Sequence, residues 1–120
     1  MPLLRLCVGA LAAGTVACAA LRQPLPETLP FIRGAIAQHC HPECSLGYLI
    51  VADAGGRDAF AYDSAWVHVY SDTRVAHRDG RDATAGDLRV GQRVSVWITP
   101  IVNESRPVQV VATILVIEPR

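Results

Sequence analysis

One short stretch of the chain brings together thiol, imidazole and carboxylate side chains, His39-Cys40-His41-Pro42-Glu43-Cys44. Thiolates and imidazoles are ligands that zinc and related borderline or soft metals prefer, so Cys40, His41 and Cys44 form a candidate metal site. A closed zinc site usually draws on a second, distant ligand pair, and no second cysteine pair follows in the sequence. A metal site is therefore only one of the alternatives for these residues.

The same two cysteines could instead form a disulfide, with Pro42 placed to make the turn between them. Disulfides form in exported proteins and are rare in the cytosol, so the compartment decides between the alternatives. Free or redox-active thiols are the third hypothesis. Because the first segment indicates export, and because Cys40 and Cys44 are the even pair that remains after it, we predict a disulfide between them and no bound cofactor.

The first segment has the parts of a bacterial signal peptide. Arg5 and the amino terminus supply positive charge, and Leu6–Ala17 is a run of 12 uncharged residues. This run is too short to span a bilayer but suits the apolar core of an export signal. It ends in Thr15-Val16-Ala17-Cys18, which resembles a lipobox, so we predict removal of residues 1–17 and a lipid on Cys18. The alternative is ordinary cleavage at a nearby alanine, which would give a soluble secreted or periplasmic protein.

The mature part divides into a tether and one small domain. Pro24, Pro26 and Pro30 exclude a helix interior, so residues 18–30 are predicted to form an extended tether between the membrane anchor and the domain. The remaining residues, 31–119, are enough for one modest core within a chain of 120 residues.

The spacing of apolar runs and turn residues in the domain is typical of an all-β protein. Apolar runs and period-2 alternation predict five strands, over residues 31–38, 47–53, 65–70, 94–99 and 107–117. Thr84–Leu88 is predicted to form one helical turn, with Thr84 as its cap and Asp87 in the capping-box position. A small five-stranded, OB-like barrel fits this count, and a small open sandwich is the alternative. Trp66 and Trp97 are expected to pack in the core or at the barrel rim.

Four segments, taken in order, resemble the YobA-like small bacterial lipoproteins: Ala65-Trp66, Leu88-Arg89-Val90-Gly91-Gln92, Val94-Ser95-Val96-Trp97 and Glu104-Ser105-Arg106-Pro107-Val108-Gln109. The resemblance covers residues 47–117 and implies an OB-like barrel in a lipoprotein of the cell envelope. The family is a domain of unknown function, so the resemblance implies no activity and no catalytic residues.

The last of these segments has two interpretations. Glu104 and Ser105 can bond the local backbone of a loop, which is an architectural role. Loops on rigid scaffolds also carry function, so Glu104, Ser105, Arg106 and Gln109 are the candidate binding loop.

Composition and motifs argue against several classes of function. The 11 basic and 11 acidic residues balance, so the chain has no basic field for nucleic acid, and no nucleic-acid partner is expected. No nucleophile motif, phosphate loop or His-Glu-x-x-His occurs, so we do not predict an enzyme. The sequence predicts an extracytoplasmic, lipid-anchored binding or accessory module for an envelope protein or small ligand. The alternative is an exported metal-binding or thiol-redox protein that uses His39–Cys44.

Overall fold

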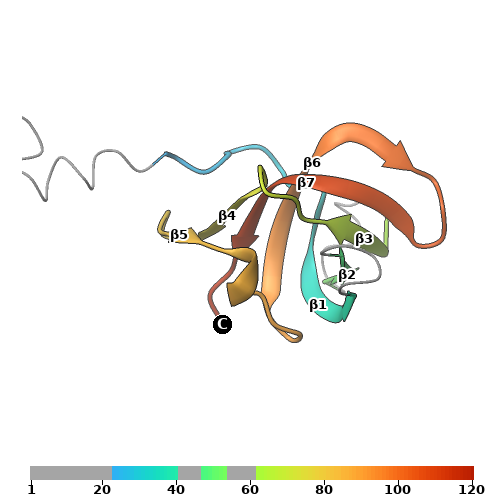
Figure 1. The fold of residues 1–120 in the computed structure, drawn as a ribbon, viewed down its shortest axis with the longest axis horizontal. Helices are drawn as coiled ribbons and strands as arrows, with labels where there is room; N and C mark the ends of the chain where they lie inside the picture. Colours follow the sequence, from blue (N-terminus) through green and yellow to red (C-terminus); the bar gives the residue numbers. More distant parts are fainter. Residues whose placement is uncertain (1–22, 41–46, 54–61) are drawn as a thin grey trace, which may run out of the picture.

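The computed structural model describes residues 23–40, 47–53 and 62–120. The predicted signal peptide and Cys18 therefore lie outside the described residues. Figure 1 shows the strands wrapped around one another, with the proline-rich segment leading in from one side. The described elements are β1 (Ile32–Cys40), β2 (Gly47–Ala52), β3 (Ser64–His68), β4 (Arg74–His77), β5 (Asp82–Ala83), a 3₁₀ turn (Ala85–Asp87), β6 (Arg93–Asn103) and β7 (Val108–Ile117).

Five of these strands close into a barrel. β2 and β6 flank β1, β3 follows β2, and β7 follows β6, all in antiparallel pairs. β3 and β7 then pair in parallel, from Ala65 opposite Val108 to His68 opposite Val111, and this pairing joins the two ends of the sheet. The order β1-β2-β3-β7-β6 confirms the predicted five-stranded, OB-like β-barrel. It also excludes the open sandwich.

Two short strands were missed by the sequence analysis. β4 pairs in parallel with the second half of β7, and β5 pairs with β4 around the turn at Gly80, whose φ is 93°. Four and two residues are too few to show an alternation, which explains why neither was predicted. The predicted helical turn is confirmed, with the Thr84 N–H donating to the Asp87 carboxylate at 2.9 Å.

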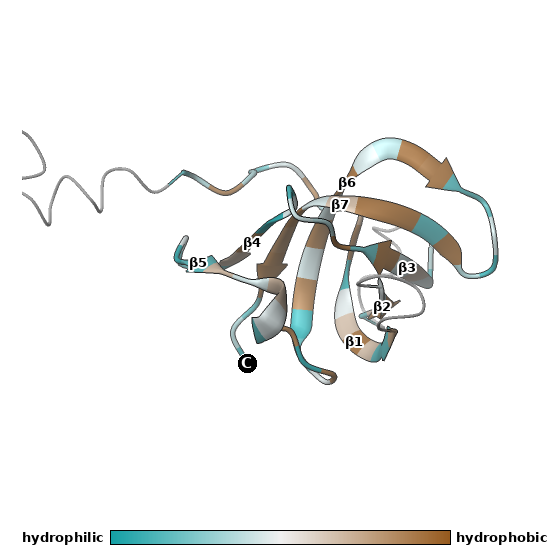
Figure 2. Ribbon diagram, in the orientation of Figure 1, coloured by the Kyte–Doolittle hydropathy of each residue, from teal (hydrophilic) through white to brown (hydrophobic). Residues whose placement is uncertain are grey.

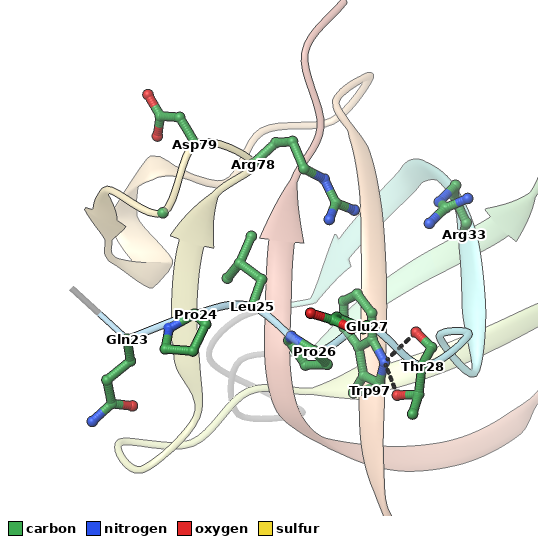
Figure 3. A pocket seen from close by; sticks show the side chains of 11 residues that line it. Gln23, Pro24, Leu25, Pro26, Glu27, Thr28, Arg33, Arg78, Asp79 and Trp97 are labelled. Carbon is green, nitrogen blue, oxygen red and sulfur yellow. Dashed lines mark hydrogen bonds between the residues drawn. The ribbon is translucent and has the colours of Figure 1, made fainter.

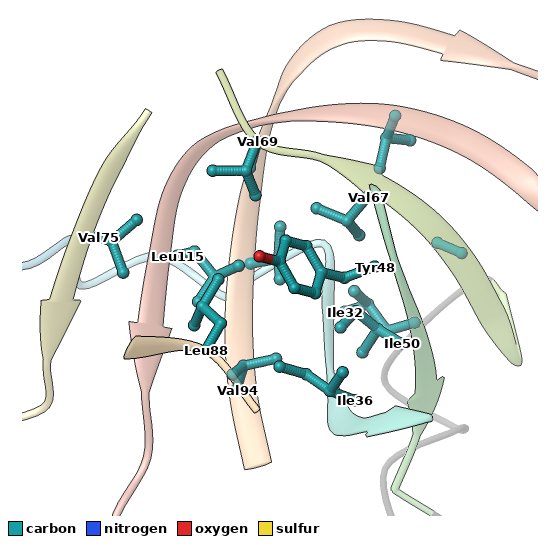
Figure 4. Close-up of a cluster of buried hydrophobic side chains, with 14 of the residues drawn as sticks. Ile32, Ile36, Tyr48, Ile50, Val67, Val69, Val75, Leu88, Val94 and Leu115 are labelled. Carbon is teal, nitrogen blue, oxygen red and sulfur yellow. The ribbon is translucent and has the colours of Figure 1, made fainter. Parts of the chain in front are cut away.

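The core consists of inward-facing aliphatic side chains and one tyrosine (Figure 4). Figure 2 shows long hydrophobic stretches along β6 and β7, two of the strands that supply it. Its fully buried members include Ile32, Ile36, Tyr48, Ile50, Val67, Val94, Val96, Val110 and Leu115. Val116 is fully buried although it lies outside this central cluster, so β7 is covered on its second face near its end. Trp66 and Trp97 are half-buried and outside the core cluster, so of the two expected positions, core or rim, the core is excluded.

At Gly34 the backbones of β1 and β2 approach each other closely. A Cβ at this position would lie 1.9 Å from the carbonyl oxygen of Val51 in β2, which no side chain tolerates. At the same point β1 changes partners, because Ile32–Ala35 pair with β6 while the strand from Gly34 onward pairs with β2. A residue without a side chain lets one strand serve both halves of the barrel.

We expect Gly34→Ala to destabilise the barrel by at least about 3 kcal/mol, because the clash is with backbone and cannot be relieved by a rotamer change. Urea unfolding of the mature protein measures this loss. Gly86→Ala is the matched control, since its Cβ would meet only the Thr84 hydroxyl at 3.5 Å. It should stay within about 0.5 kcal/mol of the parent. Equal stability of the two variants would contradict the close approach at Gly34.

Candidate functional site

The hairpin of β6 and β7 carries the predicted binding loop at its tip, at the far end of the barrel from the proline-rich segment (Figure 1). The Ser105 hydroxyl donates to the Pro107 carbonyl at 2.7 Å, and the Ser105 N–H donates to the Asn103 carbonyl at 2.8 Å. The Arg106–Pro107 peptide bond is cis. For Ser105, the architectural interpretation from the sequence is thus confirmed.

Glu104 does not bond the local backbone but joins the loop to a distant part of the chain. Its carboxylate accepts a hydrogen bond from the Tyr62 hydroxyl at 2.8 Å. This hydrogen bond raises the pKa of Tyr62 above its ordinary value, with smaller contributions from burial and from the Glu104 charge. The Tyr62 ring stacks on Phe31, with 5.4 Å between ring centroids. The residues before β3, the start of β1 and the hairpin loop are therefore held together.

These contacts border an open hollow of about 550 Å³ between the loop and the start of β3, which we call the hairpin hollow. Its walls mix acidic, basic and hydroxyl side chains. They are Tyr62, Asp63, Ser64, Glu104, Ser105, Arg106, Pro107 and Val108. Such a set can bind a polar or charged group by hydrogen bonds and ion pairs.

A second hollow, of about 400 Å³, lies next to the first on the outer face of β3, β7 and β6; we call it the strand-face hollow. The His68 ring nitrogen Nε2 lies 3.2 Å from the Gln109 amide oxygen across the parallel pair that closes the barrel. Tyr70 is 48% exposed and Ile101 is 79% exposed. No Asp, Glu, Lys or Arg lines this hollow, which is formed by His68, Tyr70, Thr99, Ile101, Asn103, Gln109, Val110 and Val111.

The structure thus divides the predicted binding loop between two neighbouring hollows. Glu104, Ser105 and Arg106 come together in the hairpin hollow, whereas Gln109 belongs to the strand-face hollow. Sequence reasoning missed Tyr62 as the hydrogen-bond partner of Glu104. Nor did it reveal that His68 lies beside Gln109. A contact between residues about forty positions apart has no local pattern, so neither partner was detectable.

The cluster of cysteines and histidines is described only in part. Cys40 ends β1, and the His39 ring stacks on Tyr48 with 4.5 Å between centroids. His41 and Cys44 lie outside the described residues, so the disulfide and the metal site both stay predictions. Within residues 23–40, 47–53 and 62–120, no three His, Cys, Asp or Glu side chains are grouped so that they could hold a metal ion.

A buried carboxylate near the carboxyl terminus was also not predicted. Glu118, whose side chain is 6% exposed, accepts hydrogen bonds from Arg78 and from the Ser95 hydroxyl. Arg33 donates to the same hydroxyl at 2.7 Å and lies 3.8 Å from the carboxylate. Burial raises the pKa of Glu118, but these hydrogen bonds and the two arginine charges outweigh burial and lower the pKa below its ordinary value. The network ties together β1, β6, the end of β4 and the chain after β7.

No protein-family model matches this chain, and neither a curated protein nor a solved structure is significantly similar to it. The resemblance to the YobA-like lipoproteins is therefore neither supported nor contradicted. In the part of the chain that the structure describes, no helix is long and apolar enough to cross a membrane.

The Glu118 network predicts a loss of stability in acid. A carboxyl group with a lowered pKa stabilises the fold above the ordinary glutamate value of 4.5, and this contribution is lost as the pH falls through the lower, folded-state pKa. Glu118→Gln should therefore cost about 1–3 kcal/mol at pH 7 and weaken the dependence of stability on pH below 4.5.

Urea unfolding between pH 2 and pH 7 tests this expectation. Asp79→Asn is the control, because Asp79 and its partner Arg81 are both exposed and such pairs contribute about 0–1 kcal/mol. Asp79→Asn should keep the pH profile of the parent. If Glu118→Gln also kept that profile, the proposed role of the Glu118 network in acid stability would be wrong.

Proposed function

We propose that this protein is an exported, lipid-anchored binding or accessory module of the cell envelope, and that the hairpin hollow and the strand-face hollow together form its contact surface. The observation that carries the proposal is the hydrogen bond between Tyr62 and Glu104. It holds the hairpin loop against the residues before β3, so the hollow is shaped before any partner arrives. A surface formed in advance loses little conformational entropy on binding.

The chemistry of the surface favours a protein partner over a small ligand. Both hollows are open rather than enclosed, and they adjoin along β7. Exposed Tyr70 and Ile101 supply apolar contact area, while Arg106 supplies a charged group that forms paired hydrogen bonds. Aromatic side chains and arginine are enriched where proteins bind one another, and uncharged side chains occupy the centres of such interfaces. An envelope protein fits this combination, and a small polar ligand is the alternative.

Export and lipidation are supported by the sequence. The apolar run before Cys18 indicates export, and Cys18 follows it where a lipid-carrying cysteine would. The alternative is an exported metal-binding or thiol-redox protein that uses His39–Cys44, of which residues 41–44 lie outside the described part of the chain.

Chemical crosslinking in native membranes, followed by capture of the full-length processed protein, tests the proposal. The double variant Ile101→Ser/Arg106→Ala removes the exposed apolar and charged groups of the contact surface. We expect it to reduce recovery of a specific crosslinked partner by at least about tenfold, as for truncated interface anchors.

The matched control is Val90→Ser/Arg81→Ala, which removes one exposed aliphatic group and one exposed arginine away from both hollows. It should leave recovery unchanged. Absence of any specific partner of the parent protein, or equal loss with both double variants, would contradict the proposed contact surface.

A further inference from the structure

The proline-rich segment before β1 was predicted to be an extended tether, yet its described part lies against the barrel (Figure 3). At one end, the Arg74 guanidinium in β4 donates to the Gln23 carbonyl at 2.7 Å and to the Pro24 carbonyl at 3.2 Å. At the other end, the Trp97 indole N–H in β6 lies 3.2 Å from the Thr28 carbonyl and 3.1 Å from its hydroxyl. The segment is thus fastened to two different strands.

Between these ends, Leu25 and Pro26 are half-buried, and an open groove of about 550 Å³ separates the segment from Arg33 and Arg78. In its hydrogen bonds with Arg74 and Trp97, the segment uses oxygen atoms as acceptors. This suits a proline-containing chain, because proline has a carbonyl but no N–H to donate. Proline also restricts the free chain, so docking costs less conformational entropy than for an ordinary flexible linker.

Docking greatly shortens the chain that could separate the barrel from a lipid on Cys18. Only five peptide steps join Cys18 to Gln23, and these can span at most about 18 Å. A segment that was free up to Phe31 could span about 45 Å. The docked segment therefore keeps the barrel close to its anchor and restricts its rotation.

The point of attachment also determines which end of the barrel is near the anchor. Figure 1 shows the segment leading away beside β4 and β5, whereas the tip of the β6–β7 hairpin lies at the opposite end. The two ends are separated within the plane of the view, so they are separate in space.

We propose that the docked segment, residues 23–28, orients the barrel on the membrane, with the β4–β5 end toward the bilayer and the hairpin hollow facing away. This inference rests on the lipid at Cys18 in the proposed function, and it makes that function more specific. The partner is then a protein on the aqueous side of the membrane, which meets the hairpin tip, and the lipid surface is not the ligand of the hollow.

Depth-dependent quenching on vesicles tests the orientation. The full chain is produced and lipidated in a bacterial host, with a genetically encoded fluorophore at position 81 or position 106. Both positions hold arginines in the parent, one in the β4–β5 turn and one at the hairpin tip. The processed protein is placed in phosphatidylcholine vesicles with a quencher on the lipid headgroup. We expect the fluorophore at position 81 to lose most of its emission and the one at position 106 to keep it.

Variants show whether the docked segment causes the difference. Arg74→Ala/Trp97→Phe removes the contacts with Gln23, Pro24 and Thr28 while keeping an aromatic ring at position 97, and it should abolish the contrast between the two fluorophores. Arg89→Ala is the matched control, because Arg89 also donates to backbone carbonyls but not to those of the segment, and it should keep the contrast. Thermal unfolding of each variant verifies that the barrel is folded.

The possible failures are distinguishable. Equal quenching at the two positions of the lipidated parent, stronger quenching at position 106, or a contrast that survives Arg74→Ala/Trp97→Phe in a folded barrel would overturn the orientation alone. An intact mass without lipid on Cys18 would overturn the anchor in the proposed function, and the orientation with it.

Discussion

The parallel pairing of β3 with β7 is the interaction on which the rest of the molecule depends. It converts the sheet into a closed barrel, whose interior encloses the hydrophobic core. Closure also brings the residues at the start of β3 beside the β6–β7 hairpin, where the Tyr62–Glu104 hydrogen bond shapes the hairpin hollow. The same pairing places His68 beside Gln109. Both hollows are thus consequences of closure.

Closure requires that β1 pair with β6 near its start and with β2 over the rest of its length. The two pairings meet at Gly34, where the β2 backbone occupies the space of a side chain. The Glu118 network connects β1 and β6 with the ends of β4 and β7 through hydrogen bonds and ion pairs, and its Arg33 directly precedes Gly34. The close approach at Gly34 therefore joins β1 to β2, and the buried carboxylate joins β1 to β6 and to the chain after β7, by unrelated means.

The sequence was informative where the signal is periodic and local. Alternation of apolar and polar residues located the five barrel strands, and the capping position of Asp87 located the helical turn. β4 and β5 were not predicted because their four and two residues are too few to show an alternation of apolar and polar side chains. Trp97 was assigned to the core or rim by its size, whereas its place on the outer face depends on a segment nearly seventy positions away.

Of the candidate site, only the hairpin loop could be predicted from the sequence. Glu104, Ser105 and Arg106 were selected as a contiguous segment, but the partners that shape the hollow come from the residues before β3. The prolines of the predicted tether, residues 18–30, exclude a helix interior, while the docking of residues 23–28 depends on donors on β4 and β6 that no local pattern reveals. Long-range hydrogen bonds are what the sequence did not show.

Amide hydrogen exchange along β3, resolved by residue, tests closure most directly. Successive N–H groups of a strand point to opposite neighbours, so a strand with partners on both sides protects every amide. A closed barrel predicts slow exchange at all four of the residues 65–68, because β2 and β7 each accept alternate amides. Fast exchange at every second residue of this run would show an open edge at β3 and would contradict the closed barrel.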